Sequence, residues 1–99
     1  MIAPEDMLAK VKMSLRISHN ALDADIQDNI AACLTDLLIC GVVPPPEEDM
    51  LILNAVKLWC RAAFSDDPAK VTLFREGYDS LKSSLMMSSR YREGVAGDD

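Results

Sequence analysis

The sequence is poor in the residues that build catalytic and metal sites, with one histidine, three cysteines and four glycines among 99 residues. The cysteines form no Cys-x-x-Cys pair and the only imidazole is His19, so the paired ligand spacing of a zinc site is absent. No glycine-rich phosphate loop occurs, no nucleophile accompanies His19, and no carboxylate pair suits acid–base chemistry. The sequence therefore predicts a protein that is not an enzyme and has no cofactor or metal site.

The sequence also lacks a long apolar run and an excess of positive charge. No segment reaches the roughly 18 apolar residues of a membrane span, and no secretion signal opens the chain, so we expect a protein that is neither membrane-bound nor secreted. The net charge is −6, and residues 1–49, with nine acids and three bases, account for all of it. Such a chain is poorly suited to hold a DNA backbone. The acidic residues serve solubility or line a surface that DNA passes without binding.

Apolar residues recur at three- and four-residue spacing and predict an all-α fold, a small four-helix bundle. The expected helices run from about Pro4 to Leu15, from Asn20 or Asp23 to about Leu38, from residues 47–49 to Phe64, and from Pro68 to about Met87. Three consecutive prolines, Pro44–Pro46, form a stiff loop between the second and third helices. We assign residues 1–88 to one helical domain and residues 89–99 to a polar, flexible C-terminal tail.

Local signals fix several helix ends. Gly41 is typical of a left-handed stop after the second helix, and Asp67 followed by Pro68 is typical of a capped helix start. The third helix is apolar around most of its circumference, which predicts a central position or an additional partner. The fourth helix carries a heptad-like seam made of Val71, Phe74, Tyr78, Leu81 and Leu85.

An acyl-carrier function is the alternative to weigh. The segment Gly77-Tyr78-Asp79-Ser80-Leu81 resembles the attachment motif of acyl carrier proteins, which would make the chain a small acidic carrier or adaptor with Ser80 as its anchor. The carrier serine opens a central helix, however, whereas Ser80 lies inside an apolar helical pattern near the C-terminus. A helix-turn-helix DNA reader is disfavoured, because the third helix is too apolar and the fourth alternates in charge.

The order of segments resembles the phage head–tail connector family, also called head-completion or adaptor proteins, over about residues 5–88. The resemblance rests on four features in sequence order: Leu8-x-x-Val11-x-x-x-Leu15-Arg16-Ile17, the acidic stretch from Ser18 to Asp25, the small-residue helix Asp25-Ile26-x-x-x-Ile30-Ala31-Ala32, and a helix after the proline loop that carries Trp59 and Phe64.

This resemblance implies a structural virion protein without enzymatic activity or cofactor. Such proteins dock under the portal as a ring of about twelve copies, extend the DNA channel and join the head to the tail. The implied partners are the portal protein, the next connector, stopper or tail protein, and further copies of the chain. DNA passes through without specific binding, and no membrane is involved. The implied location is the head–tail junction of the virion, and the host cytoplasm during assembly.

Two sets of residues are candidates for this function. The partner or oligomer interface candidates are aromatic and arginine side chains, which often anchor interfaces: Trp59, Arg61, Phe64, Arg90, Tyr91 and Arg92. The candidates for channel-lining or surface acids are Asp23, Asp25, Asp28 and Asp36.

Overall fold

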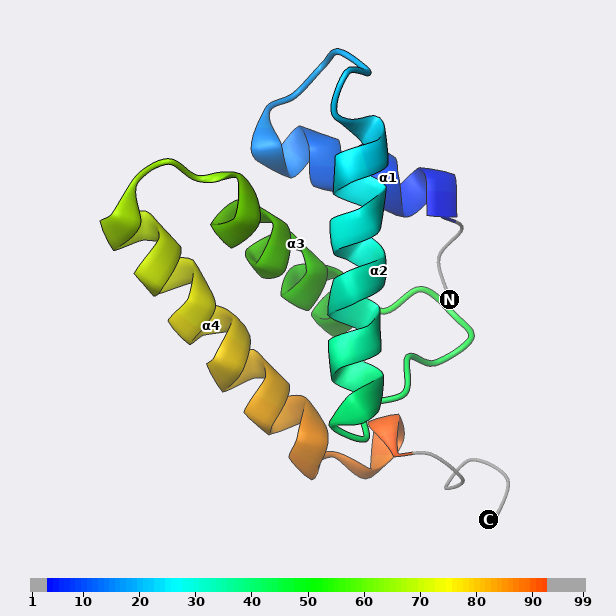
Figure 1. The fold of residues 1–99 in the computed structure, drawn as a ribbon. Helices are drawn as coiled ribbons and strands as arrows, with labels where there is room; N and C mark the ends of the chain where they lie inside the picture. The colour runs from blue at the N-terminus through cyan, green and yellow to red at the C-terminus, as the bar shows by residue number, and fades with distance from the viewer. Residues whose placement is uncertain (1–3, 93–99) are drawn as a thin grey trace.

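Four α-helices make up most of the computed structural model, which describes residues 4–92 (Figure 1). They are α1 (Pro4–Leu15), α2 (Asp23–Ile39), α3 (Met50–Phe64) and α4 (Pro68–Met87), followed by a short 3-10 helix, η1 (Ser89–Tyr91). No strand occurs in residues 4–92, so the predicted all-α fold is confirmed. None of the described helices is long and apolar enough to cross a membrane.

Helix α3 is the centre of the molecule. It packs against α4 as an antiparallel hairpin and also contacts α1 and α2 (Figure 1). Its buried side chains are Ile52, Leu53, Ala55, Val56 and Cys60. The apolar residues around most of the circumference of α3 are thus explained by its contacts with three other helices. Within α4, Gly77 faces Leu58 on α3, and a Cβ at this position would meet a Leu58 methyl carbon at 3.4 Å, an ordinary van der Waals contact.

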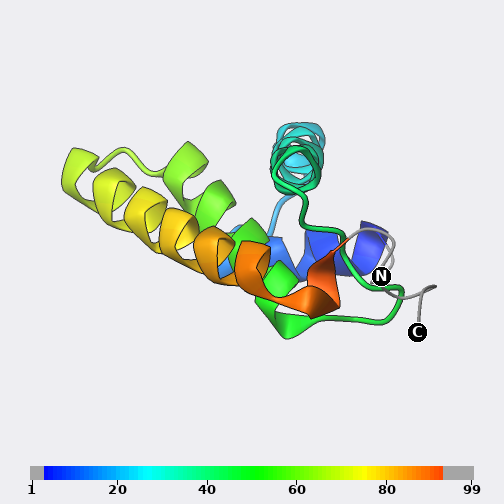
Figure 2. The ribbon, with the colours of Figure 1, turned by 90° about the horizontal axis from the view of Figure 1, so that it is seen from below.

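Helix α2 lies alone on one side of the other three helices (Figure 2). It buries one narrow stripe, formed by Ile26, Ile30, Cys33 and Leu37. Leu38, next to this stripe in sequence, is 50% exposed. Because α2 contacts the rest of the fold along one line, most of its circumference faces solvent.

Side chains and left-handed residues define the helix ends. Asp49 accepts hydrogen bonds from two backbone amides at the start of α3, and Asp67 accepts one at the start of α4, directly before Pro68. Gly41 has a φ of +87°, as expected for a helix stop. Helix α2 begins at Asp23, one of the two expected starts, and neither Asn20 nor Asp23 caps it, because Leu22 occupies the cap position and no side chain makes a cap hydrogen bond.

Arg16 is the one described non-glycine residue with a positive φ, at 59°. It follows α1, where its amide donates to the carbonyl of Met13 and the amide of Ile17 donates to that of Lys12. These two hydrogen bonds form the left-handed turn that ends many helices, and glycine usually occupies the position that Arg16 holds here. An arginine here costs about 1–2 kcal/mol of backbone strain.

The segment after α4 differs from the expected tail. Ser89–Tyr91 forms η1, and Tyr91 is 3% exposed in the core. The amide of Val43, just before the proline loop, donates to the carbonyl of Tyr91. The core therefore extends past residue 88, because Tyr91 fills space between η1 and the loop. The rest of the expected tail, residues 93–99, lies outside the described residues.

Candidate functional site

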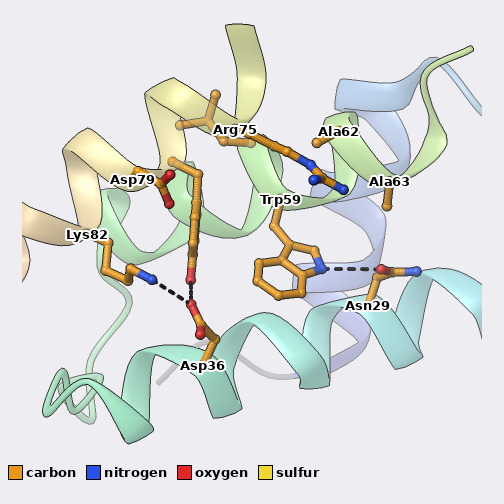
Figure 3. Close-up of a pocket in the computed structure, with 10 residues that line it drawn as sticks. Asn29, Asp36, Trp59, Ala62, Ala63, Arg75, Asp79 and Lys82 are labelled. Carbon is orange, nitrogen blue, oxygen red and sulfur yellow. Dashed lines mark hydrogen bonds and ion pairs between the residues drawn. The ribbon is translucent and has the colours of Figure 1, made fainter. Parts of the chain in front are cut away.

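A groove of about 490 Å³ separates α2 from the α3–α4 hairpin (Figure 3). It forms because α2 touches the hairpin along one stripe only. Two of the candidate residues from the sequence, Trp59 and Asp36, line it. The complete lining is Asn29 and Asp36 from α2, Leu58, Trp59, Ala62 and Ala63 from α3, and Arg75, Tyr78, Asp79 and Lys82 from α4.

Asp36 links α2 to α4 across one end of this groove. Its Oδ2 atom accepts a hydrogen bond of 2.6 Å from the hydroxyl of Tyr78 and one of 3.1 Å from the ammonium of Lys82 (Figure 3). The Lys82 nitrogen also lies 5.2 Å from the centre of the Tyr78 ring. One carboxylate therefore fixes two side chains of α4 that stand one helical turn apart.

The ionisation of these three groups follows from their contacts. The hydrogen bond from Tyr78, with a second from Lys82, lowers the pKa of Asp36 despite partial burial. The same pairing raises the pKa of Lys82. Burial, and then the bond to Asp36, raises the pKa of Tyr78. At neutral pH the cluster is therefore a carboxylate, an ammonium and a neutral phenol, which together link α2 to α4.

Trp59 closes the other end of the groove. Its indole nitrogen donates a hydrogen bond of 3.2 Å to Oδ1 of Asn29 on α2. Its ring meets the ring of Tyr78 edge-on, with centroids 5.3 Å apart. Trp59 is half-buried and contacts both α2 and α4 from its position on α3.

A second, open pocket of about 410 Å³ carries only positive charge. It lies between the end of α1 and the turn from α3 to α4, and its lining is Ser14, Leu15, Arg16, Arg61, Phe64, Ser65, Lys70 and Phe74. We call it the basic pocket. The sequence candidates Arg61 and Phe64 belong to it, whereas Arg16 and Lys70 were not selected from the sequence.

Arg61 is held in the basic pocket by neutral groups. Its Nε donates a hydrogen bond of 2.8 Å to the hydroxyl of Ser14, and its guanidinium lies 5.9 Å from the centre of the Phe74 ring. Within residues 4–92, none of Arg16, Arg61 and Lys70 forms an ion pair. The pocket therefore presents three uncompensated cations, one of them already oriented.

The remaining interface candidates meet at the opposite end of α3. Asp49 accepts a hydrogen bond of 2.8 Å from the hydroxyl of Tyr91 and one of 3.2 Å from Arg90, which also pairs with Glu47 at 2.9 Å. Burial opposes ionisation of Asp49, but the hydrogen bonds from Ile52, Tyr91 and Arg90 leave its pKa below the usual value. Tyr91 thus has an internal role, while Arg92 is exposed.

The four acidic candidates have different environments. Asp23 pairs with Lys12 at 2.7 Å, and Asp36 belongs to the groove. Asp25 and Asp28 are exposed on the first turns of α2 and form no ion pair within the described chain. Of the four candidates, only Asp25 and Asp28 leave their charge available to a partner within the described residues.

A family model described as "Phage connector protein" matches residues 7–92 of the chain. This match includes all four helices and the groove and pocket described above, apart from the first residues of α1. No curated protein and no solved structure gives a significant match.

Proposed function

This chain belongs to the phage connector protein family, and we propose that it joins the phage head to the tail by docking beneath the portal as a ring. The family match over residues 7–92 carries the proposal, because it spans nearly the whole fold. A phage structural connector resides in the virion and acts by contact rather than by catalysis. In this proposal the chain extends the DNA channel below the portal and offers a platform to the next connector, stopper or tail protein.

The charge and surface of the molecule support ring assembly around DNA. A ring subunit needs surface beyond its own core, and the outward circumference of α2 and the basic pocket supply it. The net charge of −6 disfavours a tight grip on DNA phosphates, so DNA slides through without specific binding. Arg61, Phe64 and Arg92 leave side-chain surface for a protein partner, whereas Trp59 and Tyr91 act inside the chain.

The acyl-carrier alternative is not favoured. Ser80 is exposed in the interior of α4, well after the helix start at Pro68. Its backbone carbonyl accepts a hydrogen bond from the hydroxyl of Ser84, as in an ordinary helix turn. A prosthetic-group anchor at a helix start is therefore not what this position provides.

The proposal is tested by mixing the purified chain with the portal ring encoded in the same genome and imaging the product by electron microscopy. We expect additional ring-shaped density at the tail-facing end of the portal, with about as many copies as the portal has subunits. Binding of labelled duplex DNA at low salt, measured in parallel by fluorescence anisotropy, should stay negligible. A portal that gains no density after mixing would contradict the proposed function.

A further inference from the structure

We propose that the basic pocket of one copy receives the acidic start of α2 from a neighbouring copy, so that Arg16, Arg61 and Lys70 meet the carboxylates Asp25 and Asp28. This inference rests on the proposed ring and names the contact that would build it. It requires two different surfaces of the same chain to fit each other. Such a heterologous contact propagates in one direction and closes into a ring when the rotation per subunit allows.

The pocket is built for an anion that its own chain does not supply. Three cations converge on about 410 Å³, and no acidic side chain lines this space. In a chain of net charge −6, a pocket lined by three cations and no acid is a local exception, and it offers an anionic partner charges to pair with. Arg61 is also oriented in advance by Ser14 and Phe74, which reduces the entropy lost when a carboxylate binds.

The backbone conformation of Arg16 is a second, independent observation that points to a partner. Glycine or asparagine would hold the left-handed conformation at lower cost. Arg16 nevertheless holds it, with a φ of 59°, and makes no ion pair in residues 4–92. Strained residues of this kind gather at functional sites. The side chain of Arg16 lines the basic pocket, so the strain places a charge there.

The acids that complement the pocket lie on α2. Asp25 and Asp28 are three residues apart on successive turns of one helix, both exposed and both without an ion pair in the described chain. Asp23 and Asp36, by contrast, are already paired with Lys12 and Lys82. Since α2 lies on one side of the other helices (Figure 2) and both side chains are exposed, a neighbour's pocket can reach them from solvent.

DNA is the less suitable occupant. Three cations in one pocket neutralise few phosphates, and the net charge of −6 repels a duplex. A carboxylate pair on a helix offsets two of the three cations. A guanidinium also binds a carboxylate through two parallel hydrogen bonds, which fixes orientation. The observations therefore favour a second copy of this chain.

Complementary charge reversal on the full chain tests the contact. One double variant, Arg16→Glu with Lys70→Glu, reverses the pocket, and the other, Asp25→Lys with Asp28→Lys, reverses the acids. Each alone places like charges at the contact, so we expect about tenfold weaker ring assembly on the portal, measured by the number of copies bound. An equimolar mixture of the two should recover assembly, because reversed pockets meet reversed acids and native pockets meet native acids in alternation.

Matched controls separate this effect from net charge and from misfolding. Lys57→Glu with Arg75→Glu changes the charge as much as the pocket variant, and Glu76→Lys with Asp79→Lys matches the acid variant. Lys57 is half-buried, the other three control positions are exposed, and all four lie outside the basic pocket and outside the set of interface candidates. We expect both controls to assemble like the wild type. Unchanged thermal melting of all four variants shows that each is folded.

A zero-length cross-link locates the contact directly. A carbodiimide should join the amine of Lys70 to Asp25 or Asp28, and in rings made from equal parts of ¹⁴N and ¹⁵N chains the joined peptides should carry mixed labels. Three results would overturn the inference: reversed variants that assemble normally, a mixture that fails to recover, or cross-links confined to single chains. If the wild type forms no ring on the portal, the proposed function itself fails.

Discussion

The hydroxyl of Tyr91 donates a hydrogen bond of 2.8 Å to Asp49, and the other oxygen of this carboxylate caps the first turn of α3. A single aspartate therefore fastens the C-terminal 3-10 helix to the start of the central helix. Arg90 adds a second donor to the same carboxylate. Because Tyr91 is also buried, the chain end after α4 contributes to the core instead of leaving it.

Two truncated chains test whether η1, rather than the residues after it, stabilises the fold. We expect a chain ending at Arg92 to melt like the full chain, and a chain ending at Ser88 to melt at a much lower temperature. Tyr91→Ala should cost about 3–5 kcal/mol, as for other buried aromatics, which is a large part of a small domain's stability. Chemical denaturation measures the difference. Equal stability of the two truncated chains would show that η1 is dispensable.

The link between Asp36 and Tyr78 predicts a dependence of stability on pH. The pKa of Asp36 is lowered in the folded chain, so its contribution is complete above the unfolded value of 3.8 and is lost as pH falls through the folded value. At pH 7, Asp36→Asn should cost about 1 kcal/mol, because the pair is partly solvated. The difference between wild type and variant should shrink below about pH 4. A constant difference down to pH 2 would assign the effect to packing.

Trp59 should stabilise the fold rather than serve as an exposed anchor. Trp59→Ala removes the contacts with Tyr78 and Asn29 and should cost about 3 kcal/mol, since a large side chain at a helix junction is lost. Trp59→Phe keeps a ring against Tyr78 and should cost less, about the value of the lost hydrogen bond to Asn29. Urea denaturation followed by circular dichroism compares the two. Unchanged stability of the alanine variant would make Trp59 a partner contact.

The three thiols should differ in reactivity. Burial raises the pKa of Cys33 to about 12 and that of Cys60 to about 11, so neither forms a thiolate near neutral pH. Cys40 is partly exposed at the end of α2. An aromatic disulfide reagent should therefore label one thiol per folded chain within minutes and all three in denaturant. Cys40→Ser should abolish the rapid reaction, and rapid labelling of two thiols would contradict the core assignment.

The helices were predictable from the sequence because their signals are local. Apolar spacing placed all four, and Asp67, Pro68 and Gly41 marked ends that the structure confirms. The groove was not predictable, because it depends on Asp36 meeting Tyr78, which is 42 residues away in sequence. The burial of Tyr91 was not predictable for the same reason, since its partner Asp49 precedes it by 42 residues. Local sequence patterns do not show which residues far apart in sequence will form hydrogen bonds.

The basic pocket was also missed, although two local signals were available. Arg16 stands where a glycine or asparagine usually follows a helix, so its presence conflicts with turn chemistry. Lys70 lies in the first turn of α4, where the helix dipole favours acids over bases. Each residue opposes a local preference, and conflicts of this kind are expected at functional positions. Neither signal alone shows that the two side chains share a pocket with Arg61.

Substitution of Arg16 should therefore separate an effect on folding stability from an effect on ring assembly most clearly. Arg16→Gly relieves the left-handed strain, and after the entropy that glycine adds to the unfolded chain we expect a net gain of about 0.5–1 kcal/mol. Met13 is a matched control, because it is 78% exposed with an ordinary backbone on the helix that Arg16 follows, and Met13→Gly should lose about 1 kcal/mol. If Arg16 serves a neighbouring copy, the stabilised Arg16→Gly chain should also form fewer rings on the portal, whereas the destabilised Met13→Gly chain should not. A variant that gains stability and keeps full assembly would leave the strain at Arg16 without a function.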